Sequence, residues 1–269
     1  MDKRGADARK EVKMNIVANL MLWGESTLSN LAKAVNTSRV TVSALVDELI
    51  TSEIVCKLGE RRYSLREKMN FLILKVFDGH ALIVAYCTDG DVRRKTIQFV
   101  DSMTQDGNIM HAASTVERYS EHIDLGGAAL VYCKDMPSCA LPHIFGAVCE
   151  RDHTIAVTLD LRTEFRGKTV LYVDVCEEST ILCRAGEKIC GGRIRRNNME
   201  NELFPVLDVI VPDILVFDVS SITDTEEFNT TDSLKSFCRD NNIALHIVNK
   251  DSLAPDEYSA VLAIVEKML

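Results

Sequence analysis

Residues 72–90 read LILKVFDGHALIVAYCTDG, two apolar runs joined by Asp78-Gly79. Asp-Gly between two strand-like runs is typical of a tight β-hairpin turn. We therefore predict strands over 71–77 and 81–87. In many nucleotide-dependent enzymes a hairpin of this shape holds a phosphate, so these residues raise the question of whether the chain binds a nucleotide.

The pattern on the C-terminal side of this hairpin predicts an α/β body. A second hairpin, LYVDVCEESTILCRAGEK at 171–188, matches the first, which favours two related lobes. We place the lobes at 67–150 and 151–269. The further predicted strands are 95–100, 127–133, 144–149, 154–160, 169–175, 179–184, 213–219 and 243–248. The predicted helices are 106–122, 199–209, 231–241 and 255–269.

Residues 1–66 have a helical pattern instead. A first helix is predicted from about Asp7 to Trp23, and a second in STLSNLAKAV (26–35), capped by Ser26 or Thr27. Asn36-Thr37 is the predicted turn. Ser38 then begins SRVTVSALVDELITSEI (38–54), whose apolar residues recur at i, i+3, i+4 and i+7. Two short amphipathic helices around such a turn indicate a helix-turn-helix. IVCK and RYSL predict two strands around 58–61, the wing of a winged helix.

A helix-turn-helix places the start of its second helix in the DNA major groove. Arg39 has the donor geometry to read the O6 and N7 atoms of guanine, and the wing bases would contact phosphates or the adjacent minor groove. Any single Ser or Thr here could instead only cap or turn the chain, and winged helices also serve as protein-interaction modules. The predicted DNA-contacting residues are Thr37, Ser38, Arg39, Thr41, Ser43, Lys57, Arg61 and Arg62.

Charge is distributed unevenly along the chain. Residues 1–66 carry 11 Lys and Arg against 8 Asp and Glu, a net charge of +3, whereas the 269-residue chain carries −9. Any polyanion is therefore expected to bind the N-terminal part. At 46% hydrophobic and 26% charged residues, the composition is that of a soluble globular protein. We expect a cytoplasmic location, because the sequence has no membrane span and no export signal.

The cysteines and histidines predict no metal site and no cofactor. Nine cysteines, an odd number, occur without C-x-x-C spacing, so reduced, buried thiols are expected. The histidines are scattered, and no two have ligand spacing on one element.

The order of these parts resembles the repressor-type members of the ROK family, a group of repressors, uncharacterised reading frames and sugar kinases. The resemblance covers nearly the whole chain and rests on GERR (59–62), TDGDV (88–92), LYVDV (171–175), AGEKICGG (185–192) and FPVLDVIVPDILVFDV (204–219). It implies a winged helix-turn-helix followed by a two-lobed actin-like, sugar-kinase-like body of the ribonuclease H-like type.

The kinases of that family hold phosphate with the pattern D-x-G-x-T, whose three defined positions align with Lys75, Phe77 and Gly79. A lysine cannot serve as the oxygen ligand of Mg²⁺, and a phenylalanine fills space that glycine leaves open. The glycine-rich second phosphate segment aligns with 176–180, which has no glycine and contains Glu177 and Glu178. Two carboxylates there would repel a triphosphate.

The remaining family motifs are also changed. The catalytic Asp of the family aligns with Asp152, but Arg151 precedes it where the family has Asn. RIRRNNMENE (193–202) stands where the sugar-binding and zinc motifs are expected. Arg151 and Asp152 are therefore at most candidates for a small-molecule effector cleft, and an ion-paired or exposed Asp152 is the alternative.

These features predict a transcription regulator rather than an enzyme. We expect a repressor that binds double-stranded DNA as a homodimer, with a body that serves for dimerisation and effector sensing. The alternatives are a non-enzymatic protein-interaction module and an active sugar kinase.

Overall fold

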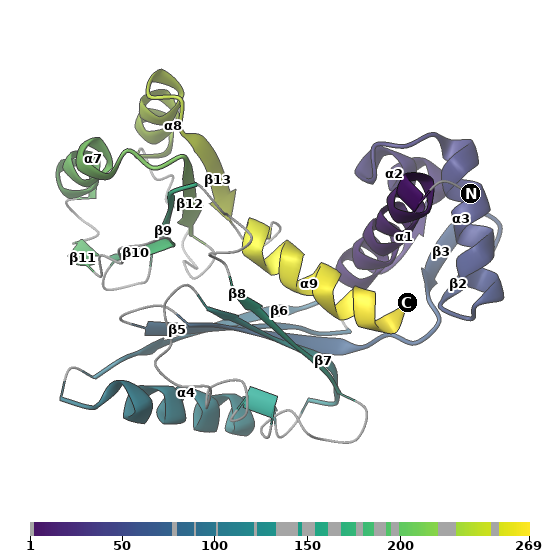
Figure 1. Cartoon of the computed structure of the whole chain (residues 1–269), viewed down its shortest axis with the longest axis horizontal. Coiled ribbons are helices and arrows are strands. Elements are labelled where there is room, and N and C mark those ends of the chain that lie inside the picture. The colour runs from purple at the N-terminus through teal and green to yellow at the C-terminus, as the bar shows by residue number, and fades with distance from the viewer. Residues whose placement is uncertain are drawn as a thin grey trace.

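Figure 1 shows the arrangement of the chain in a computed structural model. The structure describes residues 3–76, 80–88, 90–100, 102–120, 123–132, 145–146, 154–160, 168–175, 180–185, 192–194, 199–219, 230–248 and 253–269. Asp78-Gly79, Arg151, Asp152 and most of 176–180 lie outside these ranges.

The first 66 residues form a unit of three helices and a small sheet, called the head below. Its helices are α1 (Lys3–Trp23), α2 (Leu28–Ala34) and α3 (Arg39–Thr51). Strands β1 (Ser26–Thr27), β2 (Val55–Leu58) and β3 (Arg62–Leu65) pair antiparallel in the order β1-β3-β2. The three predicted helices, the cap at Thr27 and the β2–β3 hairpin are confirmed, and β1 is an addition.

The first sheet of the body contains the strands that flank Asp78-Gly79. β4 (Asn70–Val76), β5 (His80–Tyr86), β6 (Val92–Gln98), β7 (Leu125–Tyr132) and β8 (Ile155–Asp160) have the order β6-β5-β4-β7-β8. β4 and β5 pair antiparallel, as the hairpin pattern predicts, and β7 and β8 continue the sheet in parallel. Helix α4 (Gln105–Ser120) covers one face (Figure 1).

Strand β4 is apolar along its length because both of its faces are covered. Leu72 and Leu74 belong to the core that includes Ile109 and Val116 of α4. Phe71 and Ile73 point to the opposite side and share a core with helix α9 (Pro255–Met268). Because side chains alternate along a strand, Lys75 is on the α9 side.

The second sheet repeats the strand order of the first. β9 (Val170–Val175), β10 (Thr180–Ala185), β11 (Gly192–Ile194), β12 (Ile214–Asp218) and β13 (Ala244–Val248) have the order β11-β10-β9-β12-β13. Helices α7 (Met199–Ile210) and α8 (Thr230–Asp240) share a core with one face. Two sheets that begin with a hairpin and end in parallel strands agree with the two similar hairpins in the sequence.

Two sequence predictions about the body need correction, and one strand was not predicted. β8 belongs to the first sheet, because it pairs with β7, although we place residues after 150 in the second lobe. Phe145 and Gly146 are helical rather than part of a strand over 144–149, and β11 was missed because three residues are too few to show a pattern. The other predicted strands and helices of the body agree with the structure to within a few residues.

Helix α9 lies between the head and the two sheets (Figure 1). It packs on β7 and β8 and against α1. A Cβ at Gly127 of β7 would lie 2.9 Å from Ile264, so the glycine allows this close approach. Tyr258 donates a hydrogen bond to Asn15 of α1 at 2.5 Å, and Lys10 pairs with Glu266 at 2.7 Å. The head is therefore packed on the body through the last helix of the chain.

Within the described part of the chain, no helix is long and apolar enough to cross a membrane.

Candidate nucleic-acid interface and the ion-pair cluster of the body

Helix α3 is held in the head by one apolar stripe. Val42, Leu45, Val46 and Leu49 are buried against α1, α2 and the small sheet. A four-residue link joins α2 to α3, and Asn36 takes a positive φ of 47° there, a conformation that Asn tolerates better than most residues. The opposite face of α3 is exposed to solvent, as is Arg39 at the start of the helix.

The hydroxyl groups at the start of α3 have internal partners. Ser38 is the N-cap, and its Oγ accepts the Thr41 backbone N–H at 3.1 Å. The Ser38 and Thr41 hydroxyls also lie 2.9 Å apart within hydrogen-bond reach. Thr37, which is half-buried, donates to the Val35 carbonyl at 3.1 Å. The structure thus gives these three residues the capping and turn roles that were the alternative to DNA contact.

The exposed face of α3 includes residues that the sequence prediction omitted. Val40 is 82% exposed, beside exposed Arg39, and Ala44 follows Val40 at i+4. Ser43 is half-buried at the edge of the same face. Apolar side chains on an exposed helix face can contact the methyl group of thymine. The spacing from the buried stripe would have identified Val40 and Ala44, because both lie opposite to it.

The β2–β3 hairpin places three basic side chains at the surface. Lys57, Arg61 and Arg62 are exposed, and Gly59 takes a φ of +61° in the turn between the strands. Arg62 donates to Glu25 at 3.2 Å. Within the described residues, Lys57 and Arg61 have no carboxylate partner. Helix α3 packs against β2, so the structure brings the exposed face of α3 and the hairpin bases into one unit.

Acidic groups limit the positive charge of the head. Glu48 of α3 pairs with Arg9 and with Lys13, the latter at 2.6 Å, so these bases of α1 are neutralised. Asp47 and Glu60 are exposed on α3 and in the hairpin turn. The free basic groups near the start of α3 and the hairpin are therefore Arg39, Lys57 and Arg61.

A cluster of buried charges lies where the two sheets meet α9. We call Lys75, Arg94, Asp218, Asp256 and Glu257 the ion-pair cluster. Lys75 of β4 lies 2.7 Å from Asp256 and 3.3 Å from Glu257, and its side chain is 2% exposed. Its ammonium group is also 5.3 Å from the ring centre of Tyr172 on β9, within the range of a cation–π interaction.

Glu257 is the centre of this cluster. Arg94 of β6 binds its two carboxylate oxygens at 2.8 and 2.9 Å, a bidentate pair. Tyr86 donates to Glu257 at 3.0 Å, and the Ala254 N–H donates to it at 3.3 Å. Arg94 also reaches Asp218 of β12 at 3.4 Å. The cluster therefore connects the first sheet, the second sheet and the first turn of α9.

The two carboxylates of α9 respond to this environment in opposite directions. Burial would raise the pKa of Glu257, but the charges of Lys75 and Arg94 outweigh burial and lower the pKa to about 2. For Asp256, burial prevails over the attraction of Lys75, and the pKa is raised. Burial alone would lower the pKa of Lys75, yet Asp256 and Glu257 raise it above its ordinary value. The cluster thus stays charged near neutral pH chiefly through Glu257 and its two cations.

The described residues contain no group of three or more His, Cys, Asp or Glu side chains that could hold a metal ion. Cys56, Cys87 and Cys238 are free thiols, and burial raises the pKa of Cys238 to about 11. The effector candidates Arg151 and Asp152, and the phosphate-motif positions 77 and 79, lie outside the described residues.

The known structures that are similar to this chain include a transcriptional regulator and sugar kinases. No family model matches the sequence, and no curated protein matches it. The chain is similar in structure to a ROK family transcriptional regulator. That regulator, described as a homolog of the E. coli MLC protein, has 9% identity and a TM-score of 0.40, with 95% of this chain and 96% of that chain covered.

Two further structures are described as sugar kinases. One is an N-acetylglucosamine kinase from Porphyromonas gingivalis, with 9% identity, a TM-score of 0.35, and 74% of this chain and 100% of that chain covered. The other is an N-acetylmannosamine kinase from Listeria monocytogenes, with 9% identity, a TM-score of 0.34, and 74% and 99% covered.

Replacing Glu257 by Gln tests the ion-pair cluster. Near pH 7 the variant should lose about 3–5 kcal/mol of unfolding free energy, because Lys75 and Arg94 lose a buried partner. The folded pKa of Glu257 is below the ordinary 4.5, so its stabilisation is complete above pH 4.5 and is lost as the pH falls towards 2. The wild type and the variant should therefore converge between pH 5 and pH 2 in urea unfolding.

Glu67, which is exposed, provides the matched control. Glu67→Gln should follow the wild type at every pH. A difference between Glu257→Gln and wild type that stays constant from pH 7 to pH 3 would contradict the assigned role of Glu257.

Proposed function

We propose that this protein is a DNA-binding transcription regulator whose head is a winged helix-turn-helix. The observation that carries the proposal is the exposed face of α3, which begins at Arg39 and lies in one unit with the basic β2–β3 hairpin. A helix whose outer face is exposed to solvent can enter the DNA major groove, and the hairpin serves as a wing beside it. The order of parts in the sequence, which resembles ROK repressors, agrees with this function.

Each exposed group has a role in this arrangement. Arg39 reads guanine through its two-pronged donor geometry, and Val40 contacts a thymine methyl group. The open backbone N–H groups in the first turn of α3 bind a phosphate, while the Ser38 cap fixes the start of the helix. Lys57 and Arg61 contact phosphates and make binding sensitive to salt.

The body is proposed to support regulation rather than catalysis. Lys75 stands where related kinases have the acid that orients Mg²⁺, and its ammonium group is held by Asp256 and Glu257. A buried cation in this position does not provide the oxygen ligand that a nucleotide-bound metal needs. We therefore propose a non-enzymatic regulator, with repression as its mode of action and the cytoplasm as its location.

The proposal includes a homodimer, because two heads related by two-fold symmetry bind two half-sites about one helical turn apart. Light scattering should then give about twice the chain mass of 30.0 kDa. A species of 30.0 kDa at the concentration that binds DNA would contradict the dimer.

Replacing Arg39 by Ala tests the base-reading role directly. Affinity for a duplex selected by the wild-type chain from a random pool should fall by about 1–3 kcal/mol, because a bidentate base contact is lost. Affinity for unselected duplex should change much less. Fluorescence anisotropy titrations at one fixed salt concentration measure both values.

Arg239→Ala is the matched control, since it removes the same charge from an exposed site on α8. It should leave both affinities unchanged. If both variants lost the same affinity, the effect of Arg39→Ala would be explained by the loss of one positive charge. Arg39 would then have no role in base reading.

A further inference from the structure

The exposed side of α3 has one central row of side chains, which we call the α3 ridge. Its members are exposed and recur three or four residues apart, the spacing of neighbours on one helix face. They are Val40, Ala44, Asp47 and Thr51. The apolar stripe that is buried in the head lies on the opposite face of the helix. If α3 enters a DNA groove, the ridge is therefore the part that lies nearest to the base edges.

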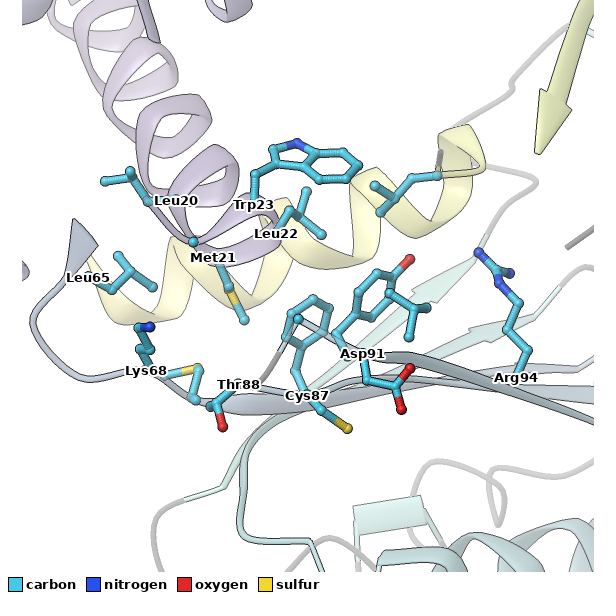
Figure 2. Close-up of a pocket in the computed structure, with 17 residues that line it drawn as sticks. Leu20, Met21, Leu22, Trp23, Leu65, Lys68, Cys87, Thr88, Asp91 and Arg94 are labelled. Atoms are coloured by element: carbon cyan, nitrogen blue, oxygen red, sulfur yellow. The ribbon is translucent and has the colours of Figure 1, made fainter. Parts of the chain in front are cut away.

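The head is attached to the body by a different surface. Figure 2 shows Leu20 and Trp23 at the end of α1 above the first sheet, where they line one cavity with Arg94 of β6. Tyr258 of α9 holds α1 through Asn15. The ridge residues stay exposed with the body in place, so DNA can reach them in the full chain without displacing the body.

The α3 ridge contains no cation. It begins with the apolar residues Val40, which is 82% exposed, and Ala44. Asp47 carries its one charge, which is negative. The exposed bases that suit phosphates, Lys57 and Arg61, lie on the β2–β3 hairpin instead. The ridge therefore offers DNA methyl groups, a hydroxyl and a carboxylate, which are groups for base edges and not for phosphates.

Asp47 differs from its neighbour Glu48 in its contacts. Glu48 pairs with Arg9 and Lys13 of α1. The Asp47 carboxylate has no partner among the described residues, and only its backbone carbonyl is engaged, by the Thr51 hydroxyl at 2.8 Å. A carboxylate that enters a DNA groove is repelled by the phosphates, so its position there is favourable only where the DNA supplies a hydrogen-bond donor.

The base edges in the major groove differ in the donors that they present. Cytosine presents its N4 amino group, whereas guanine presents two acceptors, and thymine presents one acceptor and a methyl group. Adenine presents an amino group beside its N7 acceptor, which would repel a carboxylate. Because an ionised carboxylate can only accept hydrogen bonds, cytosine is the base that suits Asp47 best.

We propose that Asp47 selects a cytosine in the DNA sequence that this protein binds. The inference rests on the proposed function, because it requires α3 to enter the major groove. Val40 and Asp47 lie two helical turns apart, about 10 Å along the axis, and base pairs are stacked about 3.4 Å apart. For a helix that lies along the groove, the cytosine is therefore about three base pairs from the thymine that Val40 contacts.

Selection of bound duplexes from a random pool tests this role with the full chain. The wild type should enrich cytosine at one position of its selected sequence. Asp47→Asn should enrich adenine there, because an amide fits the N6 and N7 atoms of adenine. Asp47→Ala should enrich no base at that position. Val40→Ala should instead relax a position about three base pairs away.

Fluorescence anisotropy measures the size of the effect on two duplexes, the selected sequence and the same sequence with that cytosine replaced by thymine. The wild type should bind the cytosine duplex about tenfold more tightly, and Asp47→Ala should bind both equally. Glu60→Ala is the matched control, because it removes an exposed carboxylate from the hairpin turn. It should strengthen binding to both duplexes and keep the preference for cytosine.

The outcomes separate the role of Asp47 from DNA binding itself. A wild type that binds no duplex would overturn the proposed function and the role of Asp47 together. If the wild type binds DNA but Asp47→Ala enriches the same bases, or strengthens binding to both duplexes by the same factor as Glu60→Ala does, Asp47 acts only through its charge. Either result would overturn the selection of cytosine while leaving the proposed function intact.

Discussion

The bidentate pair between Arg94 and Glu257 is the interaction on which the rest of the structure depends. Glu257 lies in the first turn of α9, and Arg94 lies on β6 of the first sheet. Lys75 and Asp218 extend the contact to β4 and to the second sheet. Removing charges from water is costly, so this cluster is stable only because each charge faces a partner. It fixes the start of α9, and α9 in turn supports the head through α1.

The charged residues of the body and those of the head have different roles. The buried charges of the body are occupied with one another, whereas Arg39, Lys57 and Arg61 of the head face solvent. Charges already paired and buried have little capacity to bind an external ligand, while exposed bases on a rigid unit can bind a polyanion at low cost. The head is not a loosely tethered module, because its core is continuous with that of α9 and the first sheet.

The local pattern of apolar and polar residues was sufficient to predict most helices and strands. It was not sufficient to predict which elements contact one another. The apolar runs around Asp78-Gly79 identified β4 and β5, and the i, i+3, i+4 stripe identified α3. The sequence alone showed that Lys75 does not suit a phosphate site. It did not predict that Lys75 pairs with Asp256 and Glu257, because these residues lie 181 and 182 positions further along the chain and no local pattern connects them to Lys75. β8 was assigned to the wrong lobe, because strand pairing depends on tertiary context. Ser38 and Thr41 were predicted to contact DNA, yet the structure shows that their hydroxyl groups first satisfy the helix terminus.

The assignment of DNA binding to the head is tested most directly by hydrogen–deuterium exchange of the full chain with and without random-sequence duplex DNA at low salt. We expect slower exchange over 36–44 and 57–62, because α3 enters the groove and the hairpin contacts phosphates, and unchanged exchange over 70–76 and 199–210. Protection concentrated in the body, with residues 36–44 unaffected at saturating DNA, would contradict the assignment of function to the head.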